Sequence, residues 1–240
     1  MIAKAIDKIL GLAEPHTLTI HGEEYADKPL TRIPQELRAE PITVHTLTAL
    51  VDYIRKMQED KEVMYLVHVV SPTEVQMISA LDGDRKRETL IRAVARVPEI
   101  PFERFMDSEK MVITMQAMFE NDPATDRAAV LQFCGTVKNE SVTEYGDDGV
   151  SQKATIKYGV ASVKEALVPS PCRLRPFRTF HEVEQPASDF IFRMRNEASS
   201  GVSAALFQAD GGAWMNDAAQ NIREFLEKSL EGVSGIIIIS

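Results

Sequence analysis

Apolar residues recur at three- and four-residue spacing in several stretches of the chain, and this spacing predicts amphipathic helices. The segments predicted to be helical are residues 2–13, 46–57, 107–120, 125–136 and 213–230. In the second of these, Leu47 and Leu50 begin an apolar face that the charged residues avoid. Asp107 or Ser108 stands where the third segment begins, so one of them is expected to be its N-cap.

Other stretches alternate between apolar and polar residues, or are apolar throughout, and these patterns predict strands. The predicted strands are residues 17–22, 24–33, 64–70, 74–81, 88–97, 138–145, 150–158, 165–180, 188–195, 203–208 and 236–239. The segment 64–70 is almost continuously apolar, so we expect a strand buried on both faces, with His68 as a core histidine. The connections 82–87 and 146–149 contain Asp-Gly and predict hairpins.

Helices that alternate with strand pairs predict an α+β fold with mixed, mainly antiparallel sheets and packed helices. Pro98 and Pro101 indicate a boundary between an N-terminal α+β region, residues 1–100, and a C-terminal α+β region, residues 101–240. One continuous domain is the alternative, because 240 residues suit one large domain or two small ones. The isoleucines of Ile236–Ile239 must be paired or covered, since an exposed apolar edge strand aggregates, and they favour a homo-oligomer.

Composition and charge exclude several classes of protein. The formal net charge of −9 argues against general affinity for nucleic acid, although it permits a local basic patch. Two cysteines, Cys134 and Cys172, are too few for a disulfide framework. No apolar run reaches the roughly 18 to 20 residues of a membrane span, and the N-terminus lacks the features of a signal peptide. We therefore expect a cytoplasmic protein that does not bind membranes.

A glycine pair at a predicted strand-to-helix junction is the first candidate for a ligand site. In Asp210-Gly211-Gly212, the glycines would let backbone amides approach an anion near the positive end of the helix dipole. The same residues also suit a tight turn in which Asp210 caps the helix. We favour the cap.

An alternation of arginine and phenylalanine is the second candidate. Arg175, Phe177 and Arg178 come close to Arg193 if the strands on either side of Pro186 pair. Together with Phe180, this pattern is typical of a stacking platform for a nucleotide or for single-stranded nucleic acid. In the alternative interpretation, neighbouring acidic residues neutralise these arginines across the strands. Those acidic residues are Glu182, Glu184, Asp189 and Glu197.

Motifs for catalysis, metals and cofactors were not found. The five histidines are scattered without the spacing of a metal site, and neither cysteine has a local nucleophile signature. Asp147-Asp148-Gly149 suits a hairpin turn, and no third carboxylate accompanies it at a ligand spacing for a cation. We therefore assign no catalytic or metal-binding residue and expect no cofactor.

Three segments of the C-terminal half carry a resemblance to a known family. They are Asp147–Gln152 (DDGVSQ), Leu174–Phe180 (LRPFRTF) and Ala209–Trp214 (ADGGAW). In this order they resemble the YfdQ-like family of phage and prophage proteins of unknown function, over roughly Phe102 to the C-terminus. The resemblance implies a phage accessory protein that acts in the host cytoplasm, and it carries over no catalytic residues.

From these observations we expect a non-enzymatic phage protein that acts by binding and self-association. Its target would be a host protein or a small anionic ligand, as in counter-defence. One alternative is an accessory factor of phage DNA metabolism that binds single-stranded nucleic acid, and another is an enzyme without a recognisable motif. The candidate ligand-binding residues are Arg175, Phe177, Arg178, Arg193, Asp210, Gly211 and Gly212.

Overall fold

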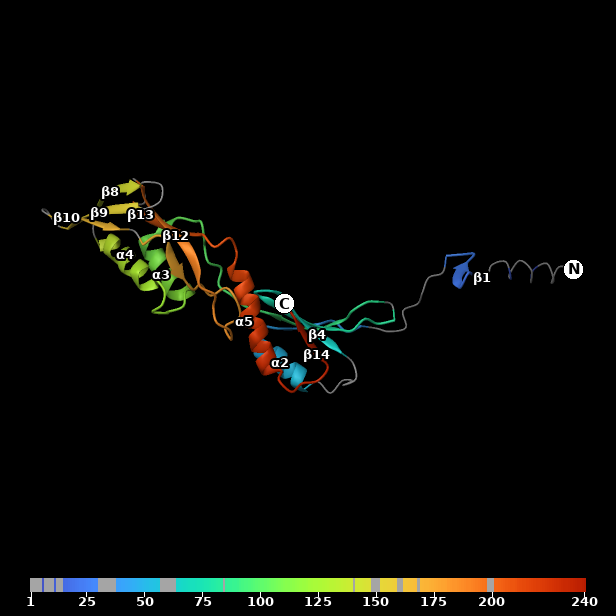
Figure 1. Ribbon diagram of the computed structural model, residues 1–240. Coiled ribbons are helices and arrows are strands. Elements are labelled where there is room, and N and C mark those ends of the chain that lie inside the picture. The colour runs from blue at the N-terminus through green and yellow to red at the C-terminus, as the bar shows by residue number, and fades with distance from the viewer. Residues whose placement is uncertain are drawn as a thin grey trace. The chain divides into compact units, whose positions relative to one another are not determined.

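The computed structural model describes most of the chain (Figure 1). The described residues are 6, 11, 15–29, 38–56, 64–83, 85–139, 141–147, 152–158, 162–167, 169–197 and 201–240. The chain separates into two compact units, residues 1–39 and 40–240. Most of the helix predicted over residues 2–13 lies outside the described residues, with only Ile6 and Gly11 described, both as helical, and so does most of the turn at Asp147-Asp148-Gly149.

In the first unit, β1 (Thr17–Ile20) pairs antiparallel with β2 (Glu23–Ala26). His21 and Gly22 connect them with φ values of 55° and 86°. Two consecutive residues with positive φ give a turn whose twist matches that of the strands it joins, which explains the tight hairpin.

The second unit has an α+β fold, as predicted, and its first core contains a five-stranded sheet. The strand order is β14 (Ile236–Ile239), β4 (Tyr65–Ser71), β5 (Glu74–Ser79), β6 (Thr89–Val94), β3 (Ile42–Val44). The three central strands are antiparallel, whereas β14 joins β4 and β3 joins β6 in parallel. Helices α2 (Leu47–Lys56) and α5 (Trp214–Ser229) bury Leu50 and Ile222 in the same apolar core as Val67 of β4.

The second core lies around a four-stranded antiparallel sheet. Its order is β11 (Cys172–Leu174), β12 (Ser188–Glu197), β13 (Gly201–Gln208), β7 (Met106–Asp107). Helices α3 (Ser108–Met118) and α4 (Arg127–Asn139) pack on the face that carries Phe190 and Phe192. The predicted N-cap is Asp107, whose side chain accepts a hydrogen bond from the amide of Lys110 at 2.8 Å. A separate antiparallel sheet contains β8 (Ser141–Asp147), β9 (Gln152–Tyr158) and β10 (Ser162–Leu167).

Two sequence-based expectations about strands are wrong. The strand over 64–70 is buried on one face only, because α2 and α5 pack on the side of Val67. His68 lies on the opposite face, where it is only half-buried, and is therefore not a core histidine. The long strand expected over 165–180 is interrupted: β10 ends at Leu167 and β11 spans Cys172–Leu174, after which the chain leaves the sheet. Proline cannot donate the ladder hydrogen bond, so Pro171 and Pro176 oppose a continuous strand.

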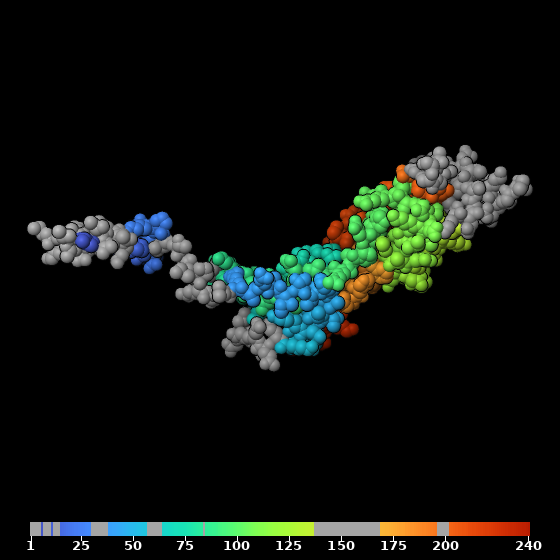
Figure 2. Space-filling model, turned by 180° about the vertical axis from the view of Figure 1, so that it is seen from behind, coloured from blue at the N-terminus to red at the C-terminus, as the bar shows by residue number. Residues whose placement is uncertain are grey.

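The segment between β11 and β12 passes from one core to the other. It leaves the second core after Leu174 and contributes Phe180 and Val183 to the first. The hydroxyl of Thr179 donates a hydrogen bond to the carbonyl of Pro72, in the β4–β5 turn. In Figure 2, residues of this part of the chain (orange) are visible between the region of β3, α2 and β4 (blue to cyan) and the region of helices α3 and α4 (green). The segment therefore contacts both cores, and it carries three of the predicted site residues.

Candidate functional site

Arg178 is a buried cation at the passage between the two cores. Its guanidinium carbon lies 4.0 Å from the centre of the Trp214 ring and 5.9 Å from that of Phe190. A carboxylate oxygen of Asp210 lies 3.9 Å from Nη2 of Arg178 and supplies the opposite charge. Burial lowers the pKa of Arg178 to about 10, which still leaves it charged at neutral pH. Because only 8% of its side chain is exposed, Arg178 is placed to hold structure together.

Asp210 and the two glycines form a tight turn before α5. One carboxylate oxygen of Asp210 accepts from the hydroxyl of Ser188 at 2.6 Å, and the other accepts from the amide of Gly212 at 3.1 Å. Burial alone would raise the pKa of Asp210, but these hydrogen bonds and the charge of Arg178 outweigh it, and the pKa is lowered. Gly211 and Gly212 have φ values of 62° and 86°, which glycine adopts without steric cost.

Asp210 does not occupy the N-cap position of α5, which is Ala213, a residue without a side-chain cap. Its carboxylate accepts from the amide of Gly212 in the preceding turn, and a hydrogen bond with the backbone of Trp214, the first residue of α5, also lowers its pKa. The amide of Gly212 already donates to this carboxylate. A second anion at the same place would be repelled by Asp210.

The other candidate residues of the arginine and phenylalanine alternation lie apart from Arg178. Arg175 pairs with Asp122 at 3.1 Å and with Glu184 at 2.6 Å, which agrees with the alternative interpretation of neutralised arginines. Phe177 is half-buried, with its ring 5.3 Å from that of His181. Arg193 lies on the face of β12 opposite to Phe190 and Phe192.

Phe180 is not available as part of a stacking platform. It is only 1% exposed and belongs to the core beneath the five-stranded sheet. The structure therefore brings Arg178, Asp210 and Gly212 together and places Arg175, Phe177 and Arg193 elsewhere. Ligand binding by any of these residues stays a prediction.

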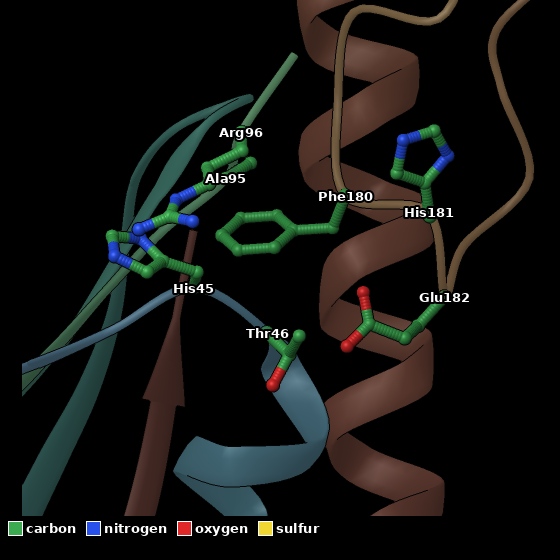
Figure 3. Close-up of a pocket in the computed structure, with 7 residues that line it drawn as sticks. All are labelled: His45, Thr46, Ala95, Arg96, Phe180, His181 and Glu182. Carbon is green, nitrogen blue, oxygen red and sulfur yellow. The ribbon is translucent and has the colours of Figure 1, made fainter.

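A pocket with a volume of about 370 Å³ lies outside the predicted site residues (Figure 3). It is lined by His45, Thr46, Ala95, Arg96, Phe180, His181 and Glu182. His45 is the first residue after β3, and Arg96 is the second residue after β6. Because β3 and β6 are parallel, with Val44 opposite Ala93, the chain leaves both strands at the same edge of the sheet. This pairing explains why two residues so far apart in sequence share one pocket.

The polar groups of the pocket differ in how many hydrogen bonds they already make within the protein. Glu182 accepts hydrogen bonds from the amide of Thr48 at 3.2 Å and from its hydroxyl at 3.4 Å, at the start of α2. The hydroxyl oxygen of Thr46 accepts from the amide of Ala49 at 3.2 Å. The glutamate and Thr46 thus occupy amides of the first turn of α2, in the manner of helix caps.

The two basic side chains at this end of the pocket, His45 and Arg96, together make fewer hydrogen bonds with the described residues than Glu182 and Thr46 do. His45 Nδ1 lies 2.9 Å from the carbonyl oxygen of Val94. A carbonyl oxygen only accepts, so Nδ1 carries the proton of this bond. Within the described part of the chain, Arg96 forms no ion pair. In Figure 3 the His45 ring lies beside the guanidinium of Arg96, the Phe180 ring points toward that guanidinium, and the His181 ring turns away.

Two further findings concern the residues that the structure describes. Among them, no three His, Cys, Asp or Glu side chains gather closely enough to hold a metal ion. None of their helices has the length and apolar character needed to cross a membrane.

Comparison with known proteins found no match to a protein-family model, a curated protein or a solved structure. The likeness to the YfdQ-like family therefore stays a prediction based on the three sequence segments.

Sequence reasoning missed His45 and Arg96 as a pair. Each is unremarkable within its own segment, since His45 precedes a helix and Arg96 precedes a proline-rich connection. The parallel pairing of β3 with β6 is what joins them, and hydrophobic periodicity carries no information about such pairing.

Proposed function

We propose that this protein acts by binding and self-association, and that β14 with the open face of the five-stranded sheet forms its association surface. The observation that carries the proposal is an edge strand of four isoleucines. Ile237 and Ile239 of this strand are 41% and 39% exposed.

The open face of this sheet continues the apolar surface of β14. Ile237 lies opposite Leu66 of β4, and Leu66 lies opposite Ile78 of β5, so three apolar side chains form a row across three strands. Val70, on the same face of β4, is 43% exposed. Apolar side chains that adjoin one another on a surface are typical of an interaction site, whereas single ones are common everywhere.

The backbone of β14 offers a second reason for association. One side of the strand pairs with β4, and the other side faces no strand among the described residues. Edge strands are ordinarily protected by charged side chains, proline or a bulge, and Ile236–Ile239 has neither a charge nor a proline. A second copy fits this edge, because two β14 strands related by a two-fold axis would satisfy each other's backbone groups.

The test is the mass of the assembly in solution, measured by native mass spectrometry and sedimentation. The wild-type protein is expected to be a dimer or a larger even-numbered assembly. Ile237→Lys places a charge at the proposed interface and should yield folded monomers, because the side chain faces away from the core. Their melting temperature should no longer depend on protein concentration, as that of the wild-type assembly should.

Ile191→Lys is the matched control. Ile191 is also a strand isoleucine on an outer sheet face, and it is 38% exposed, close to the 41% of Ile237. This variant should keep the wild-type assembly. A monomeric wild-type protein, or an assembly that survives Ile237→Lys, would show that β14 is not the association surface.

The biological setting that we propose is a phage or prophage accessory protein in the host cytoplasm, with counter-defence through a host factor as its role. The YfdQ-like segments support this setting. If the role is counter-defence, expression of the protein in bacteria that carry antiviral defence systems should raise the number of plaques that an infecting phage forms. The alternative of binding single-stranded nucleic acid loses support, because Arg175 and Arg178 are ion-paired and Phe180 is buried.

A further inference from the structure

We propose that the pocket at the ends of β3 and β6 binds a small organic anion, and that Arg96 anchors its phosphate or carboxylate group. This inference is independent of self-association, because Ile237 does not line the pocket.

The first reason to expect an anion in this pocket is the charge of Arg96. Its side chain is exposed, it lines the pocket, and it forms no ion pair within the described residues. A guanidinium presents paired N–H donors in a fixed plane that matches two oxygens of a carboxylate or phosphate. An arginine beside a pocket with this donor pattern unused is therefore suited to an oxyanion.

His45 and Thr46 add polar groups next to that charge. The Nδ1–H of His45 donates to the carbonyl of Val94, so the ring is held in place, and Nε2, which has no partner among the described residues, is left as an acceptor for a donor group of the ligand. The oxygen of Thr46 accepts from Ala49, which leaves its hydroxyl proton free to be donated. Both side chains line the same pocket as Arg96 (Figure 3).

The start of α2 is not the anion anchor. Its first-turn amides at Thr48 and Ala49 already donate to Glu182 and Thr46. Glu182 also brings a negative charge to that side of the pocket, where it would repel an anion. The anionic group of the ligand is therefore expected on the side of Arg96, away from the carboxylate.

The size and walls of the pocket indicate that the ligand has an apolar part. A volume of about 370 Å³ is larger than an isolated phosphate needs, and pockets for small organic molecules begin at about 300 Å³. Ala95 and the buried ring of Phe180 form apolar parts of the wall. A compact organic body with one anionic group matches both the wall and the arginine.

Titration of the full chain with inorganic phosphate, phenyl phosphate and benzoate at millimolar concentration, followed by NMR, tests this inference. At least one of the two organic anions is expected to bind more tightly than inorganic phosphate. The better of the two tells whether the pocket prefers a phosphate or a carboxylate. Arg96→Gln should weaken that binding by about tenfold or more, because it removes a charge-assisted hydrogen-bonding pair.

Arg104→Gln is the matched control, since Arg104 is also exposed, has no ion pair among the described residues and does not line the pocket. It makes the same change in net charge and should leave the affinity unchanged. The inference is overturned if neither organic anion binds, if inorganic phosphate binds as tightly as both, or if Arg96→Gln and Arg104→Gln have equal effects.

Discussion

The guanidinium of Arg178 stacks 4.0 Å from the centre of the Trp214 ring. Arg178 lies in the segment between β11 and β12, and Trp214 is the first residue of α5, so the contact ties that segment to the helix that covers the five-stranded sheet. The same guanidinium donates to Ser188, the first residue of β12 in the other core. One buried arginine thus contacts elements of both cores.

Arg178→Ala should therefore lower the free energy of unfolding substantially, by about 3 kcal/mol, because it leaves Asp210 without its buried partner. Arg173→Ala is the control: Arg173 pairs with Asp189 at 3.3 Å, but both side chains are more than half exposed, and such pairs contribute about 0–1 kcal/mol. Urea unfolding measures the change in unfolding free energy for both variants. Equal, small losses in the two variants would mean that Arg178 is not structural.

The stability of the protein should also depend on the charge of Asp210. Because folding lowers the pKa of Asp210, its contribution is fully present above the ordinary value of 3.8 and is lost as the pH falls through the lower folded value. The difference in unfolding free energy between wild type and Asp210→Asn should therefore shrink in acid, below about pH 4. A difference that stays constant from neutral pH into acid would contradict the lowered pKa.

Gly211→Ala and Gly212→Ala should each destabilise the protein by about 1–2 kcal/mol, because an L side chain disfavours their positive φ values. A Cβ on Gly212 would also lie 2.7 Å from the tip of Met215. That side chain is 46% exposed and is able to move, so the extra cost is small.

The control for the glycines is Gly83→Ala. Gly83 has open space around it and lacks a positive φ, so alanine should be nearly neutral there. Thermal unfolding of the three glycine variants distinguishes the cost of a positive φ from the cost of a steric contact with Met215. If Gly211→Ala is as mild as Gly83→Ala, the turn does not need the left-handed geometry.

Both cysteines should resist thiol reagents in the folded protein. Burial raises the pKa of Cys134 to about 12, and burial with the nearby charges of Asp126 and Asp189 raises that of Cys172 to about 12 as well. Because the thiolate is the reactive species, neither should react quickly with a disulfide reagent near pH 8 until denaturant is added. Fast reaction of either thiol without denaturant would contradict this burial.

Local sequence patterns determined many of the elements of this protein. The helical face with Leu47 and Leu50, and the alternation that buries Phe190 and Phe192, are both present in the structure. Asp107 caps α3 as its position predicted. These features depend on side-chain periods of 3.6 and 2 and on neighbouring backbone groups, so a short stretch of sequence contains the information for them.

The tertiary structure alone decided which of these elements meet. The parallel pairing of β3 with β6 brings His45 to Arg96, and among the described helices α2 and α5 pack on the face of the sheet that carries Val67, which leaves His68 on the opposite face. Arg178 was expected at a surface but is buried between Trp214 and Phe190. Periodicity shows which side of an element is apolar but not which distant element will cover it, because long-range pairing depends on how all the apolar faces pack together.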